Sequence, residues 1–189
     1  PMVSDDGTTA EGYVNSDASV KTLNYLADLV KNGYANQDPI TDEFLNGKCA
    51  TMLGGSWNIQ TLEGSDLNWG VSYYPVSDDG KAVSPTGDWS AGVSKNCENT
   101  DAAFEFLQWL MNTENCPTYA DTISKPATRI SSYDQMEGWD EGPRALVRWQ
   151  LENTGVARPR TPSYSILSTE FASAFLNVIS GSDAKTELD

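Results

Sequence analysis

The segment from residue 44 to residue 57 constrains what this 189-residue chain can fold into more than any other part of it. Its residues predict a short helix that ends at Gly47, a small apolar strand over residues 49–53, and a tight Gly-Gly-Ser turn over residues 54–56. The turn presents Trp57 beside the end of the strand. An exposed side chain of this size leaves a large apolar surface in water, and contact with a ligand is the usual reason for it. The segment therefore predicts a ligand-contacting tryptophan.

The composition predicts a folded protein with an acidic surface. Hydrophobic residues make up 39% of the chain, and six tryptophans argue against disorder. The formal net charge is −15, and such a surface repels phosphate backbones and anionic lipid head groups. We therefore expect no nucleic acid and no membrane surface among the partners. Because the chain begins at Pro1 in an apparent loop and ends at Asp189 in an apparent helix, we expect a piece of a longer protein.

The cysteines predict neither a disulfide nor a metal centre. The chain has three, Cys49, Cys97 and Cys116, so at least one is free. The last two flank an expected helix of about 12 residues, which is about 18 Å long, whereas a disulfide requires Cα atoms within about 7 Å. Cys49 lies in the small apolar strand, where we expect a buried thiol. Because the chain has no histidine and no Cys-x-x-Cys pair, we expect no zinc or redox site.

Helices separated by short strands predict an α/β fold. Apolar residues recur at helical spacing in the segments 17–32, 99–111, 143–153 and 166–180, and a further helix is expected from residue 183. Alternating apolar residues over 67–76 and 89–95 predict two strands besides the one at 49–53. A β-sandwich would need many regularly spaced strands, so the order of the elements favours the α/β class.

Catalysis has little support in the sequence. Nucleophile–base pairs usually need a histidine, and the chain has none. Ser56 follows a pair of glycines, but the second flanking glycine of a nucleophile elbow is absent. A glycosidase needs two carboxylates about 5–10 Å apart, and with 27 acidic residues any pair can be nominated. We therefore expect no enzyme, with a glycosidase as the open alternative.

Five residues are candidates for contact with a ligand, and a saccharide suits them best. Trp57 and Trp89 each follow a glycine-containing turn near the end of a strand, where open α/β sheets place ligands. An indole that covers the apolar face of a pyranose contributes about 1.5–2 kcal/mol, if stacking buries roughly 60–80 Å². The hydroxyls at the rim then need partners. Asp88 can accept from them, Arg129 can donate to them, and Tyr164 can donate or stack.

Each candidate also has a purely structural interpretation. The two tryptophans can instead form walls of the core. Asp88, beside Gly87, can simply form a turn. Arg129 can belong to a surface ion pair, and Tyr164 can pack against its neighbours.

Several segments resemble, in order, those of one protein family. Residues 44–57 resemble the segment "F-x-x-Gly-Lys-x-Ala-Met-x-x-x-Gly-x-Trp". Residues 87–107 resemble the block "Gly-Gly-Trp … Ile-Ser-x-x-Ser-Lys-Asn … Ala-Ala-x-x-Phe-Leu", and residues 126–129 are similar to "Leu-Pro-Ala-Arg". Together these motifs are typical of the family 1 extracellular solute-binding proteins of ABC sugar importers, which include the maltodextrin receptors. The resemblance covers nearly the whole chain. Each motif alone is weak, and the resemblance is specific because the motifs occur in the same order and at similar spacing.

The resemblance implies a type II periplasmic-binding-protein-like fold, of which the chain is the C-terminal half. Residues 1–75 and 126–189 then belong to the second lobe, and residues 76–125 form the hinge and part of the first lobe. Where the maltodextrin receptors carry an adjacent aromatic pair, this chain has Ser168 and Thr169. One stacking platform of those receptors is therefore absent.

The resemblance further implies the substrate-binding component of an ABC-type carbohydrate importer. Such a protein captures a mono- or oligosaccharide in a cleft between two lobes and delivers it to the permease subunits in the membrane. It is extracellular, either lipid-anchored at the cell surface or periplasmic, and the resemblance implies no cofactor. The main alternative is a receptor of the same fold for a polyamine, a peptide or a metal chelate, because a charge of −15 could attract cations. A purely structural interaction domain is a further alternative.

Overall fold

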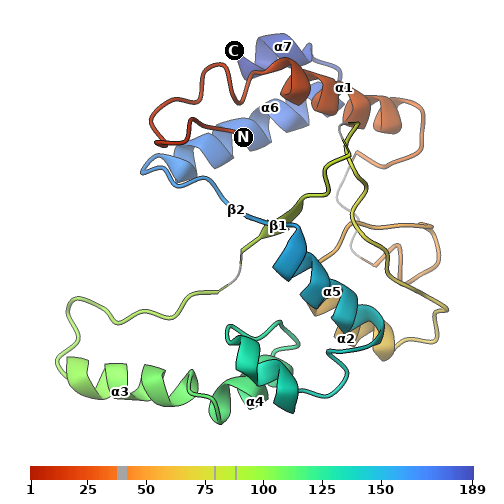
Figure 1. Cartoon of the computed structure of the whole chain (residues 1–189). Coiled ribbons are helices and arrows are strands. Elements are labelled where there is room, and N and C mark those ends of the chain that lie inside the picture. The colour runs from red at the N-terminus through yellow and green to blue at the C-terminus, as the bar shows by residue number, and fades with distance from the viewer. Residues whose placement is uncertain (38–41, 79, 88) are drawn as a thin grey trace. The chain divides into compact units, whose positions relative to one another are not determined.

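The computed structural model describes residues 1–37, 42–78, 80–87 and 89–189. Its elements follow the order α1 (Asp17–Lys31), α2 (Trp57–Glu63), β1 (Ser84–Thr86), α3 (Thr100–Leu110), α4 (Asn115–Thr122), the 3-10 helix η1 (Ile130–Gln135), α5 (Gly142–Asn153), β2 (Gly155–Ala157), α6 (Tyr164–Ile179) and α7 (Ala184–Leu188) (Figure 1). The chain divides into two compact units. Unit 1 comprises residues 1–41 and 158–189, and unit 2 comprises residues 42–157.

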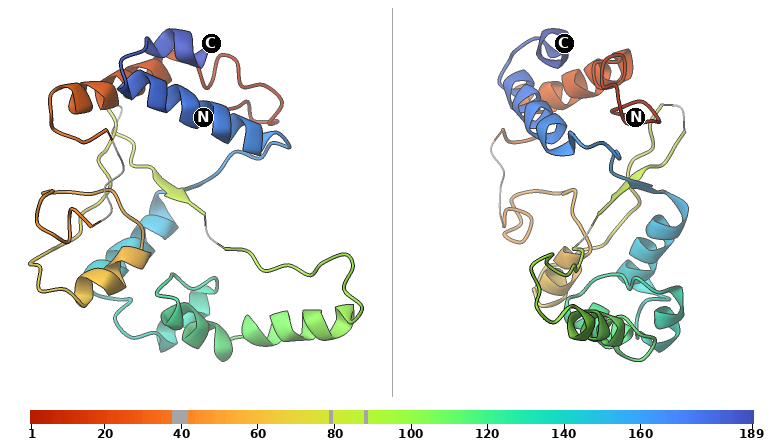
Figure 2. Two further views of the ribbon diagram at one scale, coloured as in Figure 1. Left: turned by 180° about the vertical axis from the view of Figure 1, so that it is seen from behind. Right: turned by 90° about the vertical axis from the view of Figure 1, so that its left-hand side faces the viewer.

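Unit 1 is built on three helices that pack together, α1, α6 and α7 (Figures 1 and 2). The side chain of Ser16 caps α1 by accepting from the backbone N–H of Ser19, and the side chain of Asp183 caps α7 by accepting from that of Thr186. The core gathers the apolar stripes of the three helices, namely Leu23, Ala174, Val178, Ala184 and Leu188. The helices predicted over 17–32, over 166–180 and from 183 are confirmed.

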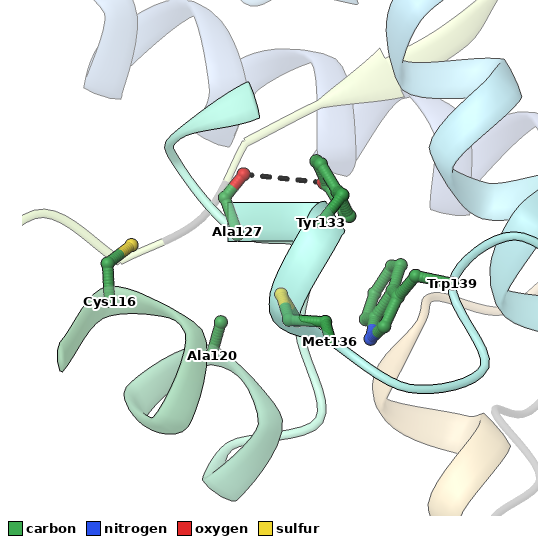
Figure 3. Packing of buried hydrophobic residues seen from close by; sticks show 6 residues of the cluster. All are labelled: Cys116, Ala120, Ala127, Tyr133, Met136 and Trp139. Atoms are coloured by element: carbon green, nitrogen blue, oxygen red, sulfur yellow. Dashed lines mark hydrogen bonds between the residues drawn. The ribbon is translucent and has the colours of Figure 1, made fainter. Parts of the chain in front are cut away.

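The described residues of unit 2 contain one parallel pair of short strands, β1 and β2, in which Ser84 lies opposite Gly155. A Cβ at Gly155 would lie 2.9 Å from Cγ2 of Thr86, so glycine allows the close approach of the two strands. The core of this unit lies elsewhere, among α4, η1 and the loop that follows η1 (Figure 3). It comprises Cys116, Ala120, Ala127, Tyr133, Met136 and Trp139.

The strands predicted over 49–53, 67–76 and 89–95 are not formed in the described parts of the chain. Alternating apolar residues favour an extended backbone, but a strand also needs a neighbour that completes its hydrogen bonds. Over the described residues such a neighbour exists only where β1 meets β2. The short helix expected before Gly47 appears as turns from residue 42 onward, and residue 41 lies outside the described residues.

Cys49 is likewise not the buried thiol expected from a strand. Its side chain is half-buried, and Sγ donates to the backbone carbonyl of Thr51 at 2.7 Å. The expectation failed because it assumed that the segment from residue 49 to residue 53 belongs to a sheet.

The helices predicted over 99–111 and 143–153 are confirmed as α3 and α5, but α3 buries none of its residues. Its predicted apolar face is only partly covered: Ala103, Leu107 and Leu110 are half-buried, and Met111 packs against the core of unit 2. Elsewhere on the helix, Phe106 stacks on Trp109 with ring centroids 6.0 Å apart. The spacing of apolar residues predicted the helix correctly. It could not predict how far the apolar face would be buried, because burial depends on the segments that pack against it. The predicted lobe boundaries at residues 75 and 126 refer to the complete two-lobed fold and stay a prediction. Within the described ranges, the helices are too short or too polar to cross a lipid bilayer.

Candidate ligand-binding site

Trp57 is the first residue of α2, and its side chain is 59% exposed. The helix is anchored from its other side, because Ile59 and Leu62 are buried. A tight turn leads into it, in which the N–H of Asn58 donates to the carbonyl of Gly55 at 3.0 Å. The short helix thus holds its backbone in place with two apolar side chains and presents the indole at its N-terminal end.

Gly55 lies against the face of the Trp57 ring. A Cβ placed on Gly55 would lie 2.1, 2.2 and 2.5 Å from the ring carbons Cζ3, Cη2 and Cε3. Three such similar distances to successive atoms place that point over the plane of the ring rather than beyond its edge. Glycine leaves space for the indole here, because a Cβ would force the ring to move from this position. One face of the ring rests on the backbone, so a ligand can stack only on the opposite face.

Lys125 is the second neighbour of the indole. Its Nζ lies over the Trp57 ring, 5.1 Å from the ring centroid, which is the geometry of a cation–π contact. The sequence interpretation did not select Lys125. The available signal was its position directly before the segment 126–129, which we had singled out. The contact itself joins two segments far apart in the chain, and nothing local could show it.

The backbone of Lys125 is fixed by the end of α4. Its N–H donates to the carbonyl of Ala120 at 3.0 Å, and Ser124 between them has φ 52°, in the left-handed region. This is the hydrogen-bond pattern of a Schellman cap, although glycine usually occupies the left-handed position. A serine held there marks a backbone that its surroundings strongly determine.

The segment from Lys125 to Arg129 is also tied to the core of unit 2. Ala127 is buried, and its carbonyl accepts from Oη of Tyr133 at 3.3 Å (Figure 3). Oγ1 of Thr128 lies 3.6 Å from Sγ of Cys116. Burial alone would raise the pKa of this thiol, but hydrogen bonds, that with Thr128 foremost, outweigh burial and lower the pKa. The core therefore holds the segment that carries both Lys125 and Arg129.

The other predicted ligand residues are distributed over both units. Arg129 is exposed and its Nε donates to the carbonyl of Met111. Trp89 is 86% exposed, and Asp88 lies outside the described residues. Tyr164 belongs to unit 1, begins α6 and is half-buried. The guanidinium carbon of Arg158 lies 6.0 Å from its ring centroid.

The geometry around Trp57 offers an aromatic face and nearby hydrogen-bond donors, which is what an uncharged polyhydroxylated ligand requires. In the described residues, no three histidine, cysteine, aspartate or glutamate side chains are grouped as ligands for a metal ion. Of the candidate site, the contacts of Trp57 with Gly55 and Lys125 are the part for which the structure gives specific distances.

Comparison with known proteins finds one matching family and several relatives of similar sequence. A family model for bacterial extracellular solute-binding proteins matches residues 2–145. The chain is 28% identical over 192 residues to a galactooligosaccharide-binding protein of Bacillus subtilis, covering 98% of this chain and 45% of that protein. It is 26% identical over 149 residues to a maltooligosaccharide ABC transporter solute-binding lipoprotein of Streptococcus pneumoniae, covering 78% of this chain and 35% of that protein.

The fold has a solved counterpart. All of this chain superposes on 49% of a cyclic alpha-maltosyl-1,6-maltose binding protein from Arthrobacter globiformis, with a TM-score of 0.76 and 22% sequence identity. This likeness confirms the expected α/β fold of the periplasmic-binding-protein-like type. The chain spans about half or less of the length of each of these three proteins.

Proposed function

The chain belongs to the bacterial extracellular solute-binding proteins, and from this premise we propose that it is part of the substrate-binding component of an ABC-type carbohydrate importer. The observation that carries the proposal is the display of Trp57. Its indole is exposed although α2 is anchored by two buried side chains, and Gly55 lies against one face of the ring, so that a ligand would stack on the other. The proteins of similar sequence have names that refer to oligosaccharides, which supports the same ligand class here.

We propose a mono- or oligosaccharide as the ligand. Trp57 and Trp89 would cover the apolar faces of sugar rings, and burial of roughly 60–80 Å² by one ring contributes about 1.5–2 kcal/mol. Arg129 and Tyr164 would donate to hydroxyl groups. For Asp88 the proposed role as an acceptor rests on the sequence alone.

The proposed activity is capture and release without chemical conversion. The family is one of binding proteins, and we propose that this chain is not an enzyme either. In the complete two-lobed protein, binding would favour a closed arrangement, because the ligand would bind the closed state more tightly than the open state. The permease subunits in the membrane would recognise the closed form. A lipid anchor or a periplasmic location would keep the receptor near them.

Calorimetric titration of the full-length protein with a panel of ligands tests this proposal. The panel comprises glucose, maltotriose, β-1,4-galactotriose and raffinose, together with spermidine and a neutral tripeptide. We expect at least one saccharide to bind and to raise the melting temperature, since a ligand at 100 times its Kd stabilises the folded state by about 2.7 kcal/mol. Binding of spermidine or the tripeptide alone would contradict the proposal.

A polyamine receptor is the second candidate because the chain carries a net charge of −15. The same titration separates the two, since a polyamine should bind more weakly as salt rises, whereas a neutral saccharide should not. Chromatography of the saccharides after incubation identifies a glycosidase. Recovery of the intact saccharide is the result that we expect.

A further inference from the structure

The ammonium of Lys125 lies over the same ring on which we propose that a sugar stacks. Its Nζ is 5.1 Å from the ring centroid and over the ring. Gly55 lies against one face of that ring, so a ligand that stacks on Trp57 uses the opposite face and shares the ring with Lys125. The lysine must then either compete with the ligand or contact it.

We propose that Lys125 is a ligand-binding residue: its ammonium covers the Trp57 indole in the empty protein and donates to the hydroxyls of a pyranose that stacks there. The proposal rests on the proposed function and adds to it a donor that the sequence interpretation did not select. It also argues against a cationic ligand at this ring. A cationic ligand would bring its charge close to the ammonium and be repelled.

The lysine is suited to move between these two positions. Its backbone is fixed by the hydrogen bond to Ala120 and by the left-handed Ser124. Its four-carbon stem is flexible, so the ammonium can shift to the rim of the ring while the backbone stays in place. An ammonium has three donors, and a sugar hydroxyl can therefore be served without removing another partner.

The relative strength of the two interactions decides in favour of contact over competition. A cation–π contact is weak where the aromatic ring is solvent-exposed, and the Trp57 side chain is more than half exposed. A hydrogen bond from a charged donor is stronger than one between neutral groups. With its other partners kept, exchanging the first for the second favours the bound state, so Lys125 should strengthen saccharide binding.

Variants of the full-length protein test the role by calorimetric titration with the saccharide that the wild type binds most tightly in the panel above. We expect Lys125→Met to weaken binding by about tenfold and Lys125→Arg by less than about threefold, because arginine keeps the charge and the donors. Lys31→Met, at the end of α1 in unit 1, removes the same charge and should leave the Kd unchanged. Melting temperatures of the ligand-free variants should match that of the wild type.

A double-mutant cycle distinguishes direct contact from a structural role. In the Trp57→Ala background, where no stacked sugar is held, Lys125→Met should lose most of its effect on the Kd. An unchanged or tighter Kd for Lys125→Met in the wild-type background would overturn the inference and identify a competitor. If the wild type binds no saccharide of the panel, the proposed function fails and this inference falls with it. If Lys125→Met does not fold, Lys125→Gln decides by the same criteria.

Discussion

Two tryptophans of unit 2 show opposite uses of the same side chain. Trp139 follows Gly138 and is 1% exposed, whereas Trp57 follows a Gly-Gly-Ser turn and is 59% exposed. The indole of Trp139 has a partner for its polar edge, because Nε1 donates to Oδ1 of Asp121 at 3.2 Å. Its ring also packs on Tyr133, with centroids 5.5 Å apart (Figure 3). Trp57 instead rests on the backbone of Gly55 with its ring half in solvent.

The difference teaches that a glycine before a tryptophan does not decide whether the indole is buried. What decides it is whether other segments supply apolar walls and an acceptor for the indole N–H. Around Trp139, α4 and η1 supply both. Around Trp57 the structure supplies the backbone of Gly55 against one face and the ammonium of Lys125 over the ring, but no apolar wall. We therefore expect stability to depend on Trp139 and ligand binding to depend on Trp57.

Trp139→Ala should have the largest effect on stability. Removing a fully buried aromatic side chain from a core costs about 3–5 kcal/mol, and the carboxylate of Asp121 loses the indole donor as well. Urea denaturation measures the loss in the free energy of unfolding. A loss below about 1 kcal/mol, the typical value for any substitution, would show that the cluster around Trp139 does not hold the unit together.

The longer helices of this fold could be predicted from the sequence, whereas α4, η1 and both observed strands could not. Helical spacing is a local signal, and α1, α3, α5 and α6 all appear where apolar residues recur at that spacing. Strands depend on a partner elsewhere in the chain. The pairing of β1 with β2 brings Ser84 beside Gly155, and no local pattern indicates which distant segment will be the neighbour.

Trp57→Ala should leave the fold intact and weaken saccharide binding by about 10- to 30-fold, equivalent to the 1.5–2 kcal/mol of one stacked ring. Trp109→Ala is the matched control, because Trp109 on α3 is 56% exposed and was not proposed as a ligand residue. Titration calorimetry on both variants gives the comparison. Equal losses of affinity would mean that exposure of an indole, rather than its placement on Gly55, explains the effect.

Gly55→Ala should separate the position of Trp57 from its presence. The added Cβ collides with the ring, and because the ring is exposed it can rotate away at little cost in stability. We expect binding to weaken by about 1 kcal/mol, or about fivefold, as the stacking face moves. Gly54→Ala is the matched control, since its Cβ would meet Nδ2 of Asn58 at 3.3 Å and no ring atom closely. A similar loss in both variants would contradict the positioning role of Gly55.

The site was predictable only in part, for a physical reason that Gly55 and Lys125 illustrate. The Gly-Gly-Ser turn indicated that Trp57 would be displayed, because turn chemistry is local. The sequence suggested that Gly55 serves the geometry of the turn. In the structure its lack of a side chain leaves space for the Trp57 ring. The approach of Lys125 depends on how α4 ends and where α2 begins. Such contacts between distant segments require the folded structure.

The smallest predicted effect on stability concerns Tyr133, which packs against Trp139 in the core of unit 2, and its pH dependence should appear only at alkaline pH. Burial raises the pKa of the Tyr133 phenol above its ordinary value near 10, although Arg148, whose guanidinium carbon lies 4.4 Å from the ring centroid, acts in the opposite direction. The folded state therefore keeps this proton at a pH where the unfolded chain has lost it. The unfolded state then binds fewer protons, and the free energy of unfolding falls as the pH rises above about 10.

Tyr133→Phe removes this dependence. Near neutral pH the variant should be less stable by about 0.5 kcal/mol, the low end for a net hydrogen bond, since the bond from Oη to the Ala127 carbonyl is long at 3.3 Å. The difference in the free energy of unfolding between the wild type and the variant should become smaller as the pH rises, because only the wild type has a phenol at this position to ionise. Urea denaturation of both proteins from about pH 8 to about pH 11 spans the titration of the unfolded phenol. A gap that stays constant would show that Tyr133 ionises in the folded state as readily as in the unfolded chain, and that the pocket around Trp139 is open to water.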